Sequence, residues 1–165
     1  MVVLGSGDPV LRDALRRAGK ARPDRVYARF DFDEAFAHRI YGGADMLLMP
    51  SRFEPCGLSQ LNAMRYGTIP IVRRTGGLAE TVVDTDDATL ADGSATGFQF
   101  DGDDADALGE TVQRACDHFA QLETWRALID HAMRRDSSWV RSAKAYRTLY
   151  HDAFDARQRY LPPHL

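Results

Sequence analysis

Short apolar runs alternate along this chain with stretches in which apolar residues recur every three or four positions. The first pattern predicts buried strands, and the second predicts helices that cover them. The predicted strands are Val2–Leu4, Arg25–Phe30, Asp45–Met49, Thr68–Val72 and Gly97–Phe100. Strands that alternate with helices form βαβ units, so the sequence predicts an α/β fold with a doubly wound, mostly parallel sheet.

The helical spacing falls between these strands and continues alone after the last one. The predicted helices are Pro9–Gly19, Asp33–Tyr41, Gly57–Tyr66, Leu78–Val83, Ala105–Phe119, Glu123–Arg134 and Trp139–Arg159. The segment Asp84–Ala95 has no apolar period and is predicted to be a surface loop. The tail Leu161–Leu165 contains two prolines and cannot continue the last helix.

The length, charge and cysteine count argue against several classes of protein. The chain has 165 residues and a formal net charge of −3, so it fits one soluble domain and is a poor candidate for nucleic-acid binding. No apolar run is long enough to span a membrane, and Met1–Leu4 is too short for a signal peptide. Two cysteines, Cys56 and Cys116, are too few for a disulfide framework, so a reduced, cytoplasmic protein is expected.

The segment Pro50–Leu61 carries the strongest chemical signal. It places Glu54 and Gly57 between the end of a predicted strand and the start of a predicted helix, where open α/β sheets bind ligands. The N–H groups of Gly57, Leu58 and Ser59, together with the helix dipole, favour an anion such as a diphosphate. From spacing alone, a capped helix start without a ligand is an equally good interpretation.

A second strand–turn–helix junction contains Gly76 and Gly77. A glycine pair is ordinary turn chemistry, but two such junctions on successive strands would meet at one edge of the sheet. Phe32 follows another strand and has the ring needed to stack on a base, although core or rim packing is favoured before any family argument.

The sequence gives little evidence for a dinucleotide site, a metal site or a catalytic nucleophile. The run Gly5-Ser6-Gly7 has Val10 where a dinucleotide fingerprint needs its third glycine. The histidines are scattered without metal-ligand spacing, and no nucleophile signature is present. We therefore expect no metal and no cofactor.

Taken together, these motifs closely resemble bacterial glycogen synthase and plant starch synthase, which are retaining glucosyltransferases of the GT-B fold. The resemblance rests on Gly42–Asp45, Pro50–Leu58, Tyr66–Thr68 and Pro70–Val82, and extends to Leu4–Pro9, Glu34–Tyr41, Ala91–Gly93, Gly97–Phe98, Trp139 and Ala143–Tyr146.

The resemblance implies a single Rossmann-like domain, the C-terminal nucleotide-sugar-binding domain of a GT-B enzyme. Its body would cover about residues 1–135, and residues 139–160 would form the helix that crosses back toward the N-terminal domain. That N-terminal acceptor domain, with its Lys-x-Gly-Gly-Leu loop and a catalytic-site histidine, is not found in these residues. The isolated chain is therefore expected to be inactive.

The resemblance also assigns roles to the two junctions. Glu54 would be the catalytic carboxylate at the donor sugar, and Phe32 would lie at the adenine. The other residues implied at the donor are Pro55, Cys56, Gly57, Leu58, Ser59, Gly76 and Gly77. Asn62 stands where the wider superfamily has a second acidic residue, which argues against a paired carboxylate.

The implied reaction is transfer of glucose from ADP-glucose to the non-reducing end of an α-1,4-glucan, with retention. ADP and ADP-glucose would be the small-molecule partners, and the glucan would be held through the N-terminal domain, with no nucleic acid or membrane involved. The alternatives are a GT-B transferase that uses UDP-glucose or GDP-mannose, a non-catalytic nucleotide-binding module, and a purely structural domain.

Overall fold

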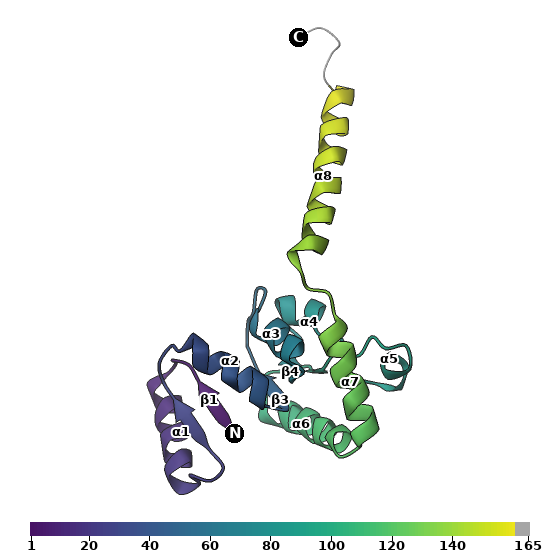
Figure 1. The fold of residues 1–165 in the computed structure, drawn as a ribbon. Helices are drawn as coiled ribbons and strands as arrows, with labels where there is room; N and C mark the ends of the chain where they lie inside the picture. Colours follow the sequence, from purple (N-terminus) through teal and green to yellow (C-terminus); the bar gives the residue numbers. More distant parts are fainter. Residues whose placement is uncertain (161–165) are drawn as a thin grey trace. The chain divides into compact units, whose positions relative to one another are not determined.

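The computed structural model describes residues 1–160, which form two compact units (Figure 1). The first unit covers residues 1–133, and the second begins at Arg134. The predicted tail Leu161–Leu165 lies outside the described residues. The strands are β1 (Val2–Leu4), β2 (Tyr27–Arg29), β3 (Met46–Met49), β4 (Ile69–Arg73) and β5 (Phe98–Phe100). The helices are α1 (Pro9–Ala21), α2 (Glu34–Gly43), α3 (Ser59–Tyr66), α4 (Gly76–Thr81), α5 (Asp87–Ala91), α6 (Ala105–Phe119), α7 (Leu122–Arg134) and α8 (Trp139–Tyr160).

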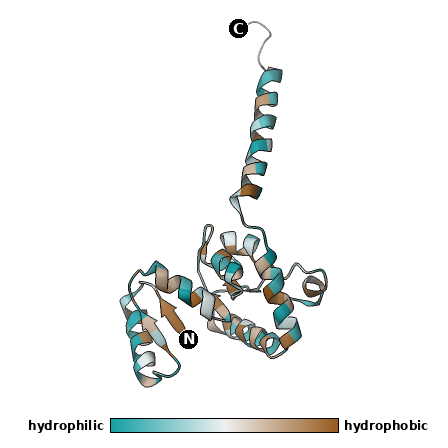
Figure 2. Cartoon of the chain, in the orientation of Figure 1, coloured by the Kyte–Doolittle hydropathy of each residue, from teal (hydrophilic) through white to brown (hydrophobic). Residues whose placement is uncertain are grey.

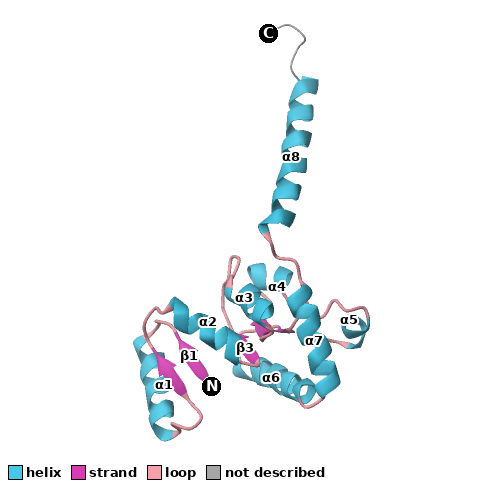
Figure 3. Cartoon of the chain, viewed as in Figure 1, coloured by secondary structure: helices cyan, strands magenta, loops and turns pink. Residues whose placement is uncertain are grey.

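Within residues 1–160, every strand pair is parallel, as the alternation of strands and helices predicted. Figure 3 shows the strands in magenta among the helices in cyan. The strands form two hydrogen-bonded sheets, one with the order β1–β2 and the other with the order β3–β4–β5. In the larger sheet Met49 pairs with Val72, and Arg73 pairs with Phe100. The carboxyl ends of these three strands therefore lie at one edge, where the segments that carry the candidate chemistry begin.

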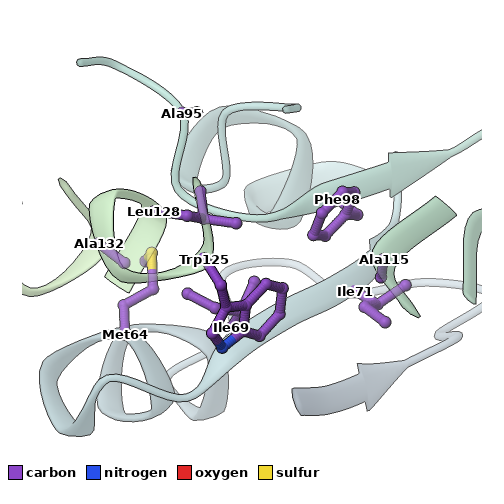
Figure 4. Close-up of a cluster of buried hydrophobic side chains, with 9 residues drawn as sticks. All are labelled: Met64, Ile69, Ile71, Ala95, Phe98, Ala115, Trp125, Leu128 and Ala132. Atoms are coloured by element: carbon purple, nitrogen blue, oxygen red, sulfur yellow. The ribbon is translucent and has the colours of Figure 1, made fainter. Parts of the chain in front are cut away.

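Strand β4 is the centre of the first unit because it is buried on both faces. Ile69 and Ile71 point into the larger hydrophobic cluster, and Val72 packs in a second one with Leu78 and Val82. Alternate residues of a strand face opposite sides, so helices cover both faces of this sheet. The larger cluster contains Met64, Ile69, Ile71, Ala95, Phe98, Ala115, Trp125, Leu128 and Ala132 (Figure 4).

An ion pair fixes the segment after α4 to α6. The guanidinium of Arg114 donates to both carboxylate oxygens of Asp84, at 3.0 and 2.8 Å, and also to the carbonyl of Thr85. Asp84 in turn accepts a hydrogen bond from the backbone N–H of Gln99. This network joins β5, α6 and the segment that follows α4 into one rigid block.

The prediction of a surface loop over Asp84–Ala95 is wrong. The segment contains α5, and Thr85 and Ala95 are buried. Its helix depends on a capping box, in which the Asp86 carboxylate accepts from the backbone N–H of Thr89 while the Thr89 hydroxyl accepts from the N–H of Asp86. A helix of five residues is too short to show an apolar period, which is why the pattern missed it.

The second unit consists largely of α8 among the described residues. Figure 2 shows hydrophobic and hydrophilic residues interleaved along this helix. Trp139, Tyr146 and Tyr150 are exposed, and they are spaced by seven and four residues. This spacing places the three aromatic rings on one face of the helix.

Aspartate side chains cap α1, α2, α5 and α6. In α2 the Asp33 carboxylate accepts a hydrogen bond from the backbone N–H of Phe36, and in α5 Asp86 accepts one from the N–H of Thr89. These hydrogen bonds favour the ionised form and lower the pKa of both Asp33 and Asp86, with Arg29 adding a charge interaction at Asp33.

The lowered pKa values predict a loss of stability in acid. A carboxylate whose pKa is lower in the folded state stabilises the fold above its ordinary pKa of about 3.9, and this contribution disappears as the pH falls through the folded-state value. We expect the Tm of the chain to fall between pH 5 and pH 3, and to fall less in the double variant Asp33→Asn/Asp86→Asn. Thermal unfolding followed by circular dichroism measures both, with Glu110→Gln on the exposed face of α6 as control. Equal drops in the double variant and the wild type would contradict the assignment.

Candidate functional site

The two predicted junctions lie against each other in the structure. The turn that contains Glu54 and Gly57 follows β3, and the Gly76–Gly77 turn follows β4, which pairs with β3. The backbone N–H of Gly77 donates to the carbonyl of Glu54 at 3.1 Å. Residues that are more than twenty positions apart in the sequence therefore form one surface at the carboxyl edge of the sheet.

The glycine pair is required by this close backbone contact. A Cβ on Gly76 would lie 2.1 Å from the carbonyl oxygen of Glu54, and a Cβ on Gly77 would lie 2.4 Å from that of Cys56. Gly76 also has a φ of +45°, which side chains disfavour. Only glycine allows the two turns to approach this closely.

The helix start at α3 is open toward solvent. Leu58 is the N-cap residue of α3 and Thr75 that of α4, and neither supplies a side-chain cap, in contrast to the four helices capped by aspartate. Among residues 1–160, the N–H groups of Gly57 and Ser59 have no hydrogen-bond acceptor. Unpaired N–H groups at the positive end of a helix dipole bind anions. The alternative interpretation, a helix start that its own side chains cap, is not what the structure shows.

Glu54 is half-buried beside this open helix start. Its backbone carbonyl is fixed by Gly77, while its carboxylate makes no hydrogen bond or ion pair within the described part of the chain. The backbone of Glu54 is therefore held in position, and its carboxylate remains free to accept hydrogen bonds from a ligand. Pro55, Cys56 and Leu58 are exposed around it, and Ser59 is half-buried.

Phe32 lies in the segment between β2 and α2, and its side chain is 92% exposed. The core or rim packing that the residue pattern favoured is therefore wrong in its first form, because a ring this exposed is not in the core. The neighbouring Phe30 does pack, because Arg12 and Arg16 lie over its ring at 5.6 and 5.0 Å from the centroid. The structure joins the glycine turns to Glu54 directly, whereas Phe32 belongs to the part of the chain built on the β1–β2 sheet.

A cavity of about 200 Å³ lies beside these turns, where β3, β4 and β5 end. Its lining residues are Pro50, Arg52, Arg73, Phe100, Asp103, Asp104, Ala105 and Leu108. The Arg73 guanidinium donates to the carbonyls of Arg52, at 2.8 Å, and Gly102, and so ties the loop after β3 to the loop after β5. Arg73 stands at the start of the basic second junction in the sequence, but it was not predicted to be a site residue.

Gln60 and Thr81 were also not predicted as parts of the site. Gln60 is fully buried under the Glu54–Gly57 turn and donates hydrogen bonds to the carbonyls of Cys56 and Gly57. Thr81 receives another hydrogen bond from the same amide. A glutamine within a helical stretch gives no sequence signal of such a role.

No group of three or more His, Cys, Asp or Glu side chains in residues 1–160 gathers as a metal site would. Over the same residues, no helix combines the length and the apolar composition needed to cross a membrane.

Known proteins are similar to this chain over most of its length. A family model described as "Glycosyl transferases group 1" matches residues 31–126, which contain both junctions. The glycogen synthase of Methylocella silvestris is 51% identical over 152 residues, which are 92% of this chain and 32% of that protein. The chain thus spans about a third of the length of the curated relatives that it matches.

Solved structures show the same relationship. The catalytic domain of starch synthase IV from Arabidopsis thaliana, bound to ADP and acarbose, is 37% identical with a TM-score of 0.78, and the match covers 91% of this chain and 31% of that one. Sucrose-phosphate synthase from Thermosynechococcus elongatus is 26% identical with a TM-score of 0.63, and the match covers 94% of this chain and 38% of that one. These likenesses support the Rossmann-like, GT-B type of fold that the resemblance implied. The chain belongs to the group 1 glycosyltransferases.

Proposed function

We propose that this chain is the donor-binding domain of a glycogen synthase, which transfers glucose from ADP-glucose to the non-reducing end of an α-1,4-glucan with retention. The observation that carries the proposal is the uncapped start of α3, placed directly after the Glu54 turn and packed on the Gly76–Gly77 turn. The names of the relatives support it, since about half of the aligned residues are identical to those of glycogen synthases. We expect the protein to act in the cytoplasm.

In this proposal the diphosphate of the donor lies at the N–H groups of Gly57, Leu58 and Ser59. The Glu54 carboxylate accepts hydrogen bonds from the sugar hydroxyls, while Pro55, Cys56, Gly76 and Gly77 line the donor. The exposed ring of Phe32 stacks on the adenine. The Arabidopsis starch synthase structure is bound to ADP, which supports nucleotide binding by this chain. We propose that no metal or other cofactor takes part.

The chemical contribution of these residues is electrostatic. When the bond between the sugar and the diphosphate breaks, negative charge develops on the leaving group and positive charge on the sugar carbon. In this proposal the N–H groups at the start of α3 stabilise the negative charge on the leaving diphosphate, and the negative Glu54 carboxylate near the sugar stabilises the positive charge on the sugar carbon. Because these groups are already held in place by backbone contacts, little reorganisation is needed during the reaction.

Transfer also needs an acceptor held in line with the donor. We propose that the rest of the whole protein supplies the glucan-binding surface, and that the exposed aromatic face of α8 (Trp139, Tyr146 and Tyr150) contacts it. On this view the 165-residue chain binds donor nucleotide but does not elongate glycogen by itself.

Titration of the chain with ADP, followed by amide chemical shifts in NMR, tests the donor site. We expect shifts that cluster at Phe32, Glu54 and residues 57–59, and that are larger with ADP than with UDP at equal concentration. Larger shifts with UDP would instead favour a UDP-glucose transferase. In the whole protein, failure to incorporate glucose from ADP-glucose into glycogen would contradict the proposed reaction.

A further inference from the structure

Gln60 is a polar side chain in a position where the fold has otherwise placed apolar ones. It lies on the buried face of α3 with Ala63 and Met64, and its exposed fraction is 0%. The two N–H bonds of its amide Nε2 are shared among three acceptors, the carbonyls of Cys56 at 3.1 Å and Gly57 at 2.9 Å and the hydroxyl of Thr81 at 3.0 Å. One amide thus reaches the turn after β3 and the helix that follows β4.

The direction of this amide is fixed by its partners. Two of them are backbone carbonyls, which only accept hydrogen bonds. The third, the Thr81 hydroxyl, gives its own proton to the carbonyl of Gly77, so toward Gln60 it also acts as an acceptor. Three acceptors therefore surround the position of the amide NH₂ group, and a carboxylate of the same shape would meet them with oxygen.

The other side of the amide supports the turn sterically. A Cβ on Gly57 would lie 2.4 Å from the Oε1 atom of Gln60, so the turn rests directly on the amide group. Gly57 has a φ of +70°, which a side chain would also disfavour. Oε1 itself is buried and has no hydrogen-bond partner in residues 1–160.

An unsatisfied buried oxygen costs stability, so a side chain selected only to stabilise the core would be apolar at this position. What Gln60 provides instead is a defined geometry between two turns. Within residues 1–160, one other hydrogen bond joins the two turns, from the N–H of Gly77 to the carbonyl of Glu54. Through Thr81 the amide adds a second connection, which continues to the carbonyl of Gly77.

We propose that Gln60 and Thr81 are positioning residues that hold the Cys56–Gly57 turn, and with it the Glu54 carboxylate and the α3 helix start, in register with the start of α4. The inference rests on the proposed function for the identity of the ligand, a nucleotide diphosphate sugar. It adds to that function two residues that act through the turn and do not touch the donor.

The test uses the whole protein with Gln60→Met, Gln60→Glu, Thr81→Val and Thr81→Ser. Gln60→Met and Thr81→Val are expected to lower kcat with ADP-glucose by about tenfold or more, because small displacements of reacting groups cost this much, with less change in KM and in Tm. Gln60→Glu is expected to lower kcat more than Gln60→Met does. Thr81→Ser keeps the hydroxyl and should therefore keep a kcat close to that of the wild type. The matched control is Thr111→Val, which removes a buried hydroxyl that donates to Ala107 within α6.

A second measurement does not depend on the reaction. In the 165-residue chain without ligand, Thr81→Val should shift the amide signals of residues 56–59 and speed their hydrogen exchange, whereas Thr81→Ser should not. If the wild type uses ADP-glucose and both Gln60→Met and Thr81→Val keep its kcat, the inference is wrong. If the wild type does not use ADP-glucose, the proposed function fails, and the NMR comparison alone decides, with unchanged signals in Thr81→Val overturning the positioning role.

Discussion

Replacing Glu54 with glutamine in the whole protein is expected to lower kcat by a factor on the order of 10²–10³, which is typical for the loss of one preorganised electrostatic contact. The structure gives the reason, because the Glu54 backbone is fixed by Gly77 while its carboxylate has no partner in the described part of the chain. Glutamine keeps the shape and loses the charge, so the effect falls on the chemical step.

The measurement is glucose transfer from ADP-glucose to glycogen, with kcat and KM determined separately. The fold is expected to be unchanged, because the Glu54 carboxylate forms no hydrogen bond or ion pair within residues 1–160, and the Tm of the variant checks this point. ADP should still shift the amides of residues 57–59 in the chain that carries Glu54→Gln. Glu123→Gln, which changes a 92% exposed carboxylate on α7, is the control for loss of charge alone. A kcat within about threefold of the wild type would remove Glu54 from the catalytic role, since a single such contact is worth far more.

Much of the fold was predictable from local pattern. The five strands and the longer helices are where hydrophobic spacing indicated them, and the parallel pairing follows from their alternation. Strand β4 is apolar at every buried position, which matches its burial on both faces. Element ends were less predictable: α3 begins at Ser59, two residues after the predicted start, because Gly57 adopts a left-handed turn that spacing cannot reveal.

The turn residues of the candidate site were also predictable, because Gly57, Gly76 and Gly77 stand at strand–helix boundaries where backbone constraints are local. The contacts between the turns were not. The Gln60 amide donates to the Thr81 hydroxyl across 21 residues, and the Arg73 guanidinium donates to backbone carbonyls across 21 and 29 residues. Such bonds depend on tertiary placement, and glutamine, threonine and arginine are common in sequences for many other reasons. Helix α5 was missed for a different reason, since its five residues are too few to show an apolar period.

Replacing Gly77 with alanine is expected to destabilise the chain and abolish nucleotide binding, and it provides a sharp test of the packing at the site. A Cβ at this position would lie 2.4 Å from the carbonyl oxygen of Cys56 and 2.6 Å from its Cα, and backbone atoms cannot turn away as a side chain can. Overpacking of this kind costs about 3 kcal/mol, at the upper end of its usual range. Thermal or urea unfolding gives the free energy, and ADP titration followed by NMR gives the binding.

The sign of this effect separates packing from helix propensity. Gly77 is a helical residue of α4, and alanine favours a helix over glycine by about 1 kcal/mol, so propensity alone predicts that the substitution stabilises the chain. Gly109 in α6 is the matched control, because a Cβ there meets nothing within 4 Å, and Gly109→Ala is expected to raise the free energy of unfolding. If both variants were more stable than the wild type, the two turns would not be in contact as the structure shows. If Gly77→Ala lowers stability while Gly109→Ala raises it, the contact between the Glu54 and Gly76–Gly77 turns is real, and the loss of ADP-induced shifts in Gly77→Ala would then assign nucleotide binding to that contact.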